Sequence, residues 1–227
     1  MFYDRCLKLP QLLKKKSLLL LGPRQTGKST LALHAFPEAV YVNLAAADVF
    51  RELSERPELV RQRLAAHTKV LIFDEAQRIP AIFDEVQLLL DRNKQLRVLL
   101  TGSSARKLRR TGVNLLPGRI WQAALFPLVF PELGEGRIKA RLQRGSLPGF
   151  IDSEDYRREL KNYVGLYLDE EVRAEGLVRG IGDFSRFLNI AALSNGEQLN
   201  FTKISSDTGI KVNTVRSYFQ ILEDTLI

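Results

Sequence analysis

One segment near the amino terminus has the residue types and spacing of a phosphate-binding loop. It fits the pattern G-x-x-x-x-G-K-[S/T], in which glycines let backbone N–H groups close around phosphate oxygens and the next helix adds its partial positive charge. In such a loop Lys28 would reach the β- and γ-phosphates and Ser29 would ligate Mg²⁺. An ordinary glycine-containing turn is the alternative, but an apolar run before the segment and a helical pattern after it favour the loop. The segment consists of Gly22, Pro23, Arg24, Gln25, Thr26, Gly27, Lys28, Ser29 and Thr30.

Two carboxylates end a later apolar run, where Val70 to Phe73 leads into Asp74 and Glu75. An Asp at the end of such a strand helps to hold the magnesium in P-loop enzymes, so Asp74 and Ser29 form the predicted metal site. Glu75 is placed to orient or deprotonate an attacking water, as a general base does. The start of a plain loop would also explain the two carboxylates, but beside a phosphate loop the two motifs support each other.

Hydroxyl and basic side chains lie between the next two apolar runs, and Arg119 begins the second of these runs. Ser103 comes at a strand end, where α/β sheets bind ligands, and is predicted to contact the γ-phosphate or the attacking water. The sequence Thr101 to Ser104 is also ordinary turn chemistry. Arg119 is the predicted arginine finger, which would stabilise transition-state charge in cis or across a subunit interface. A solvated or nucleic-acid-facing loop explains the basic residues Arg106 to Arg110 at least as well.

These residues require a sheet that brings strand ends together. Continuous apolar runs separated by helix-length segments imply a parallel sheet covered on both faces, so the fold class is α/β. Helical spacing is seen between the runs, at Ser29–Ala35, Val49–Ala66 and Ala81–Lys94. Trp121 is expected in the core. The five runs are Ser17–Leu21, Ala39–Leu44, Lys69–Phe73, Leu96–Thr101 and Arg119–Leu125.

The pattern changes after Leu125, where prolines and glycines break the alternation and helices follow at Ser153–Ala174 and Ile181–Leu193. We therefore predict a P-loop core over residues 1–130, a helical region over 131–194 and a helix-turn-helix segment over 195–227.

The last segment reads as a helix, a tight turn at Asp207–Gly209 and a second helix at Val212–Leu222. Its polar side chains could approach bases or phosphates, which predicts DNA as a partner. Several apolar side chains commit much of the second helix to packing, which is typical of protein interaction modules, so both partners stay open. The polar residues are Lys203, Lys211, Asn213, Thr214 and Arg216.

Composition narrows the classes of partner and location. The 227 residues include 34 Lys and Arg against 26 Asp and Glu, and the formal charge of +8 favours polyanions such as ATP or nucleic acid. The single Cys6 cannot form an intramolecular disulfide, and no cysteine cluster suggests a zinc site, so we expect a cytoplasmic protein. No apolar stretch reaches the roughly 20 residues that span a bilayer, and the amino terminus does not read as a signal peptide, so we expect no membrane partner.

Several motifs together resemble the AAA+ ATPases of the AAA_14/DUF4143 group. The resemblance runs from Tyr3-Asp4-Arg5 through GPRQTGKST, FDEAQRIP, LLTGSSARKL and PGRI to the terminal NTVRSYFQILEDTLI, which is nearly the whole chain. It implies a P-loop core with strand order 5-1-4-3-2, a helical region, a winged-helix-like segment and, in many relatives, a nuclease-like C-terminal domain. Because the sequence ends at Ile227 within an apolar run, the wing is expected to be truncated.

Taken together, the motifs predict a protein that binds ATP with Mg²⁺, hydrolyses it to ADP and phosphate, and couples this to conformational change. Lys28, Glu75, Ser103 and Arg119 are the predicted catalytic residues. The alternative is a nucleotide-dependent binding switch for a protein or DNA partner, with slow or no hydrolysis. A kinase or other transferase is a third hypothesis, although no residue specifies an acceptor. A finger acting in trans would require a homo-oligomer.

Overall fold

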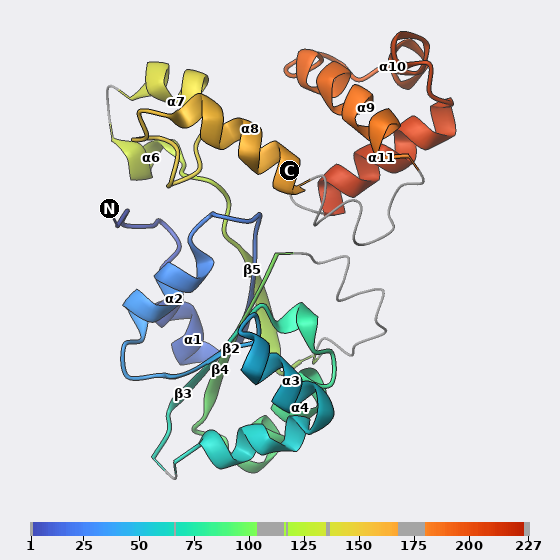
Figure 1. The fold of residues 1–227 in the computed structure, drawn as a ribbon. Coiled ribbons are helices and arrows are strands. Elements are labelled where there is room, and N and C mark those ends of the chain that lie inside the picture. The colour runs from blue at the N-terminus through green and yellow to red at the C-terminus, as the bar shows by residue number, and fades with distance from the viewer. Residues whose placement is uncertain are drawn as a thin grey trace. The chain divides into compact units, whose positions relative to one another are not determined.

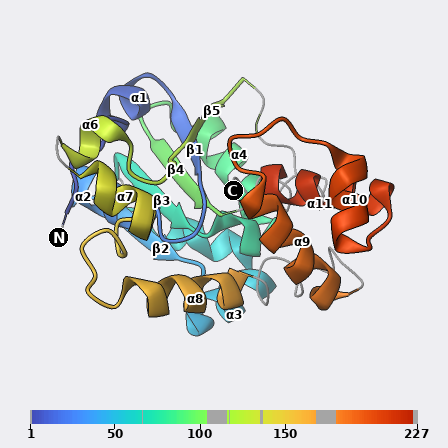
Figure 2. The same cartoon turned by 90° about the horizontal axis from the view of Figure 1, so that it is seen from above.

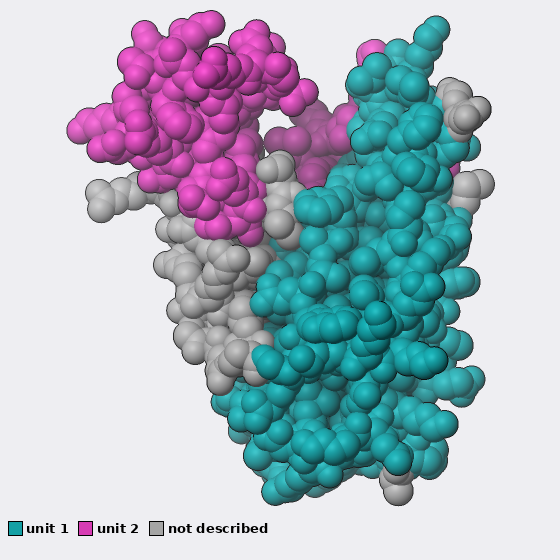
Figure 3. Space-filling view, turned by 180° about the vertical axis from the view of Figure 1, so that it is seen from behind, with its two compact units in different colours: residues 1–151 teal, residues 152–227 magenta. Residues whose placement is uncertain are grey.

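The computed structural model describes residues 2–65, 67–103, 116, 118–134, 137–167 and 180–224. The chain forms two compact units, residues 1–151 and 152–227 (Figure 3). The first unit continues past the predicted boundary at residue 130, because Leu128, Leu133 and Ile151 form a buried cluster against which Tyr3 packs. The compact units therefore differ from the predicted division, and the three functional parts stay a prediction.

A five-stranded parallel sheet forms the centre of the first unit. The strands lie in the order β2-β3-β4-β1-β5, and every neighbouring pair is parallel. This is the predicted order 5-1-4-3-2 read from the other edge, so the predicted fold class is confirmed. The strands are β1 (Ser17–Leu21), β2 (Val40–Asn43), β3 (Val70–Asp74), β4 (Arg97–Gly102) and β5 (Ile120–Ala124).

Helices cover both faces of this sheet (Figures 1 and 2). Helices α1 (Leu9–Lys15) and α2 (Lys28–Ala35) cover one face, and α3 (Ala47–Glu55) and α4 (Ile82–Arg92) cover the other. The prediction of one helix over Val49–Ala66 is wrong, because Pro57 cannot continue an α-helix. The chain instead forms a 3-10 helix, η1 (Pro57–Arg63). A second 3-10 helix, η2 (Ala76–Arg78), follows β3.

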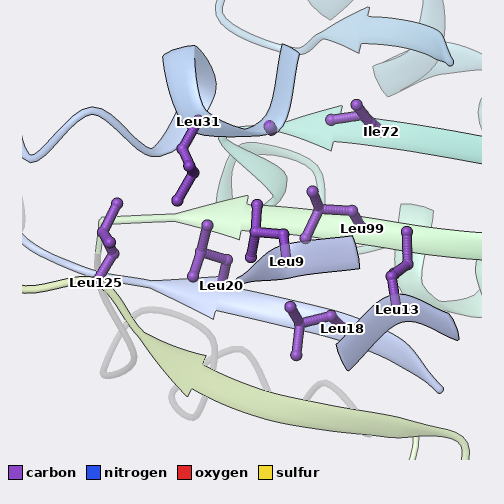
Figure 4. Packing of buried hydrophobic residues seen from close by; sticks show 9 residues of the cluster. Leu9, Leu13, Leu18, Leu20, Leu31, Ile72, Leu99 and Leu125 are labelled. Atoms are coloured by element: carbon purple, nitrogen blue, oxygen red, sulfur yellow. The ribbon is translucent and has the colours of Figure 1, made fainter. Parts of the chain in front are cut away.

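One cluster of the core lies between the sheet and the pair α1 and α2, as Figure 4 shows. All five residues of β1 are buried, because this strand has neighbours on both sides and helices over both faces. Trp121, which we expected in the core, is 41% exposed because β5 is an edge strand. The labelled cluster consists of Leu9, Leu13, Leu18, Leu20, Leu31, Ile72, Leu99 and Leu125.

Short helices follow β5 within the first unit, namely α6 (Phe130–Leu133) and α7 (Ile138–Arg144). The second unit contains α8 (Tyr156–Tyr167), α9 (Ile181–Leu193), α10 (Phe201–Thr208) and α11 (Val212–Asp224). Apolar side chains of α9, α10 and α11 form its core, with Phe184 and Phe187 fully buried.

The turn between α10 and α11 is tight, and Gly209 takes a left-handed φ of 70° at the end of α10. The predicted pair of helices is therefore present. Residues 180–224 contain no strand, and residues 225–227 lie outside the described part, so the winged-helix segment stays a prediction. None of the helices in the described parts of the chain is long and apolar enough to cross a membrane.

Candidate functional site

The predicted phosphate loop joins β1 to α2 at the carboxyl edge of the sheet. Gly27 has a φ of 87°, a conformation that residues with a Cβ rarely adopt. Gly22 lies so close to the strand-end backbone that an added Cβ would be 2.2 Å from the carbonyl oxygen of Leu125. Because α2 begins at Lys28, the N–H groups of its first turn adjoin the loop. The loop therefore has the backbone shape that an anion site requires.

The lysine of the loop is folded inside it. Lys28 is buried, and its Nζ donates to the carbonyl oxygens of Gly22 and Pro23, both at 2.9 Å. The hydroxyl of Thr26 donates to the same Pro23 carbonyl oxygen at 2.9 Å. A bound phosphate would compete with these carbonyls for the ammonium group, which is the contact that the sequence predicted for Lys28.

The two predicted metal ligands lie together. Ser29 Oγ donates to Asp74 Oδ1 at 2.8 Å, and the hydroxyl of Thr101 donates to the same carboxylate oxygen. The other oxygen, Oδ2, accepts from the hydroxyl of Tyr41 at 2.6 Å. Carboxylate and hydroxyl oxygens are the ligands that Mg²⁺ prefers, so this donor set fits the predicted ion.

Tyr41 and Thr101 are functional candidates that our sequence reasoning missed. Tyr41 lies on β2, and only the pairing of β2 with β3 brings it to Asp74. Burial, followed by the hydrogen bond to Asp74, raises the pKa of Tyr41, so its hydroxyl stays protonated and remains a donor. Thr101 also accepts from the backbone N–H of Glu75 at 3.1 Å, and so it joins both acidic residues.

The predicted general base lies next to the predicted sensor. Glu75 has a left-handed φ of 59°, which is uncommon for a residue with a side chain. Its Oε2 accepts from the amide of Gln77 and lies 3.5 Å from Ser103 Oγ. Glu75 and Ser103 come from the ends of β3 and β4, so the parallel pairing of these strands brings them together. Gln77 was not predicted.

Arg119 does not join this cluster. It comes just before β5, whose first residue Ile120 pairs with Ser17 at the start of β1, whereas the loop follows the end of β1. Its guanidinium binds both carboxylate oxygens of Asp91 on α4, at 3.0 and 3.1 Å. Within one chain, the structure thus separates Arg119 from the phosphate loop, and a finger in trans stays a prediction. The basic residues 106–110 lie outside the described residues.

A buried arginine supports the loop from the other side. Arg5 Nη1 donates to the carbonyl oxygen of Thr26 at 2.7 Å, and Nη2 donates to that of Phe126 at 2.5 Å. Its Nε forms an ion pair with Glu132 Oε1 at 3.1 Å, and both side chains are about 95% buried. Arg5 belongs to the Tyr3-Asp4-Arg5 motif of the family resemblance, but no role was predicted for it.

A small pocket of about 90 Å³ adjoins the loop. A larger pocket of about 580 Å³ opens beside the end of α2 and the segment before β3, and no residue of the loop lines it. The small pocket is therefore the one relevant to the site. It is lined by Phe2, Tyr3, Arg5, Thr26, Gly27, Thr30, Leu31 and Pro148.

The predicted DNA-contacting residues belong to the second unit. Lys203, Lys211, Asn213 and Arg216 are exposed, and Thr214 is half-buried. The guanidinium of Arg216 lies over the ring of Phe201, 5.3 Å from its centroid. The exposure of these side chains is compatible with either a nucleic-acid or a protein partner.

Comparison with known proteins identifies related sequences. Residues 136–227 match a domain of unknown function (DUF8612). This match does not support the DUF4143 part of the family resemblance seen in the sequence. An uncharacterized protein of Mycobacterium bovis and one of Mycobacterium tuberculosis are each 27% identical over 217 residues, covering 92% of this chain and 48% of the relative. The chain thus spans about half the length of the curated relatives it matches.

Two solved structures are also similar in part. The Pif1 helicase from Candida albicans is 18% identical, with a TM-score of 0.31, covering 66% of this chain and 44% of the helicase chain. A STAND ATPase with a tetratricopeptide repeat sensor from Pyrococcus horikoshii is 16% identical, with a TM-score of 0.35, covering 91% of this chain and 32% of that chain.

The match that covers the phosphate loop and the acidic cluster is to an AAA domain, the AAA_14 family, over residues 14–134. It includes all five strands of the sheet. Membership agrees with the loop geometry and supports nucleotide binding. The chain belongs to this family of AAA-type P-loop ATPases.

Proposed function

We propose that the chain binds Mg-ATP at the loop of residues 22–30 and hydrolyses it to ADP and phosphate. One observation carries this proposal. The sheet brings a phosphate loop, an oxygen donor set for Mg²⁺ and a carboxylate beside a hydroxyl to the same edge. The third component supports an enzyme over a protein that only holds nucleotide.

Binding would use the residues of the loop and α2. Lys28 exchanges its contacts with the Gly22 and Pro23 carbonyls for phosphate oxygens, and the N–H groups at the start of α2 donate to the same anion. Ser29 and Asp74 would hold Mg²⁺, which supplies charge neutralisation on the phosphates. The adenine ring of ATP would occupy the aromatic-lined pocket beside Gly27 and Thr30.

Hydrolysis requires a water aligned with the γ-phosphorus. In our proposal Glu75 takes the proton of that water as its oxygen bonds to phosphorus, and the bond from phosphorus to the β,γ-bridging oxygen breaks. The electron pair of that bond leaves with ADP. Ser103, 3.5 Å from the Glu75 carboxylate, donates to the water or to the γ-phosphate.

Coupling of hydrolysis to conformational change is the further part of this proposal. A nucleotide-dependent binding switch with slow hydrolysis uses the same loop and the same metal site. The carboxylate beside Ser103 favours the hydrolase, because a switch needs no base next to the γ-phosphate. Duplex DNA remains a proposed partner for the exposed residues of the second unit. A homo-oligomer remains the proposed setting in which Arg119 would act as a finger in trans.

The test is magnesium-dependent phosphate release from ATP by the purified chain, with and without duplex DNA. We expect Lys28→Ala to lose nucleotide binding and Glu75→Gln to bind ATP but lose turnover. Glu38→Gln, a change at an exposed carboxylate, is the matched control and should behave as the unaltered chain.

Each outcome separates the hypotheses. Loss of turnover in Glu75→Gln with ATP binding retained, while Glu38→Gln keeps full turnover, supports the hydrolase. Tight ATP binding without turnover in the unaltered chain supports the switch. Unchanged turnover in Glu75→Gln contradicts the role of this residue as the base. Faster phosphate release in the presence of duplex DNA would support DNA as the partner.

A further inference from the structure

A buried glutamine connects the two residues that we assign to the attacking water. Gln77 is 5% exposed, and its Nε2 donates to Glu75 Oε2 and, at 3.1 Å, to Ser103 Oγ. An amide N–H donated to a carboxylate forms a charge-assisted hydrogen bond, which is stronger than a neutral one. The direction of the Glu75 side chain is therefore set by Gln77 as well as by the strand.

Local backbone geometry places the amide there. The left-handed φ of Glu75 turns the chain immediately after β3, and η2 follows at Ala76–Arg78. This turn returns Gln77 to the sheet edge beside the end of β4. The Glu75 conformation is sparsely populated for a residue with a side chain, and strain of this kind is found mainly at functional sites.

Gly102 provides the room that the amide occupies. A Cβ built at Gly102 would lie 2.8 Å from Gln77 Oε1 and 3.3 Å from Leu21 Cδ2. Gly102 is not among the glycines with positive φ, so its backbone does not require glycine. Glycine at this position therefore leaves space for Gln77 and is not required by the backbone conformation.

The amide is not explained by stability alone. Gln77 Oε1 is buried and has no hydrogen-bond partner among the described residues. A buried carbonyl oxygen without a partner opposes folding, so an apolar side chain of similar size would suit a purely structural position better. What an apolar side chain cannot provide is the pair of hydrogen bonds from Nε2.

We propose that Gln77 is a positioning residue that holds the Glu75 carboxylate against Ser103, so that base and hydroxyl act on the same water. This inference rests on the proposed hydrolysis. The amide of Gln77 contacts Glu75 and Ser103, which belong neither to the phosphate loop nor to the metal donors. Replacing Gln77 should therefore change turnover and not nucleotide affinity.

The first test is Gln77→Met, which keeps the length of the side chain and removes the donor. We expect kcat to fall about 10- to 100-fold, with KM and the Kd for ATP within about twofold of the unaltered chain. Gln87→Met, at a half-buried amide within α4, is the matched control and should change neither constant. Thermal unfolding of each variant checks that it folds.

The second test uses the space at Gly102. Gly102→Ala should displace the amide and lower kcat by a similar factor, because its methyl group would meet Gln77 Oε1. In a Gln77→Ala background the same change should have little further effect on kcat, because the amide is already gone. Additive effects of the two changes would contradict the proposal.

The remaining outcomes separate this inference from the proposed function. If Glu75→Gln stops turnover but Gln77→Met does not, the positioning role is wrong and the hydrolase stands. A change in Kd with an unchanged kcat also overturns it. If the unaltered chain shows no turnover, the proposed hydrolysis fails, and a double-mutant cycle on unfolding between Gln77→Met and Glu75→Ala tests the contact itself. Additive unfolding free energies in that cycle would remove the contact as well.

Discussion

Arg5 donates a hydrogen bond to the carbonyl oxygen of Thr26, inside the phosphate loop, at 2.7 Å. The same guanidinium binds the carbonyl oxygen of Phe126 and pairs with Glu132, so one buried side chain joins the amino-terminal segment, the loop and α6. The shape of the loop thus depends on residues outside the motif that defines it.

Replacing Arg5 should destabilise the first unit strongly. In Arg5→Met the carboxylate of Glu132 stays buried without its cation, and breaking a buried pair from one side costs about 3–5 kcal/mol. Urea denaturation measures the free energy of unfolding. Arg186→Met, which removes an ion pair whose side chains are more than half exposed, is the control and should cost no more than about 1 kcal/mol. Equal losses of unfolding free energy in both variants would show that the buried Arg5–Glu132 pair contributes no more to stability than an exposed pair.

Stability should decrease in acid through Glu132. Burial alone would raise the pKa of Glu132, but hydrogen bonds from the N–H groups of Val129 and Cys6, together with Arg5, hold it below the ordinary 4.5. A depressed folded-state pKa contributes stability that is complete above the unfolded pKa and is lost as pH falls through the folded value.

We therefore expect the free energy of unfolding to decrease between about pH 5 and about pH 3, and Glu132→Gln to show a smaller decrease. Urea denaturation at a series of pH values measures it. An identical pH dependence in Glu132→Gln would assign the acid sensitivity to other groups.

Tyr41→Phe should weaken the response to magnesium. The Tyr41 hydroxyl donates to Asp74 Oδ2 at 2.6 Å, and loss of such an orienting partner typically costs about 10- to 100-fold in metal affinity. The measurement is the Mg²⁺ concentration that gives half-maximal phosphate release. Tyr156→Phe, outside the site, is the control. A half-maximal concentration unchanged by Tyr41→Phe would mean that Asp74 needs no support from β2.

Arg119→Ala should leave the turnover of the dilute chain unchanged. Arg119 pairs with Asp91 at the edge of the sheet opposite the loop, and both side chains are partly exposed, so its loss disturbs neither the site nor the core. Phosphate release measured over a range of protein concentrations tests this. A loss that develops only at high concentration would support a finger in trans, and a loss at all concentrations would contradict the separation seen here.

The sequence by itself determined the parts of the site that are continuous in the chain. Glycine, lysine and hydroxyl residues at fixed spacing specify a phosphate loop, because all of them act within one turn between a strand and a helix. Two carboxylates after an apolar run were equally readable, since the run fixes the strand and the strand fixes its end. The apolar runs also indicated five parallel strands, and their order followed from the resemblance.

Only the tertiary structure decided which distant residues support these parts. Tyr41 and Arg5 reach Asp74 and Thr26 from other segments, and Gln77 reaches Ser103 across two strand ends, so no local spacing encodes these contacts. The partner of Arg119 was decided in the same way. Its position at the start of the fifth run already implied the amino edge of a parallel sheet, but only the packing of α4 brings Asp91 to its guanidinium.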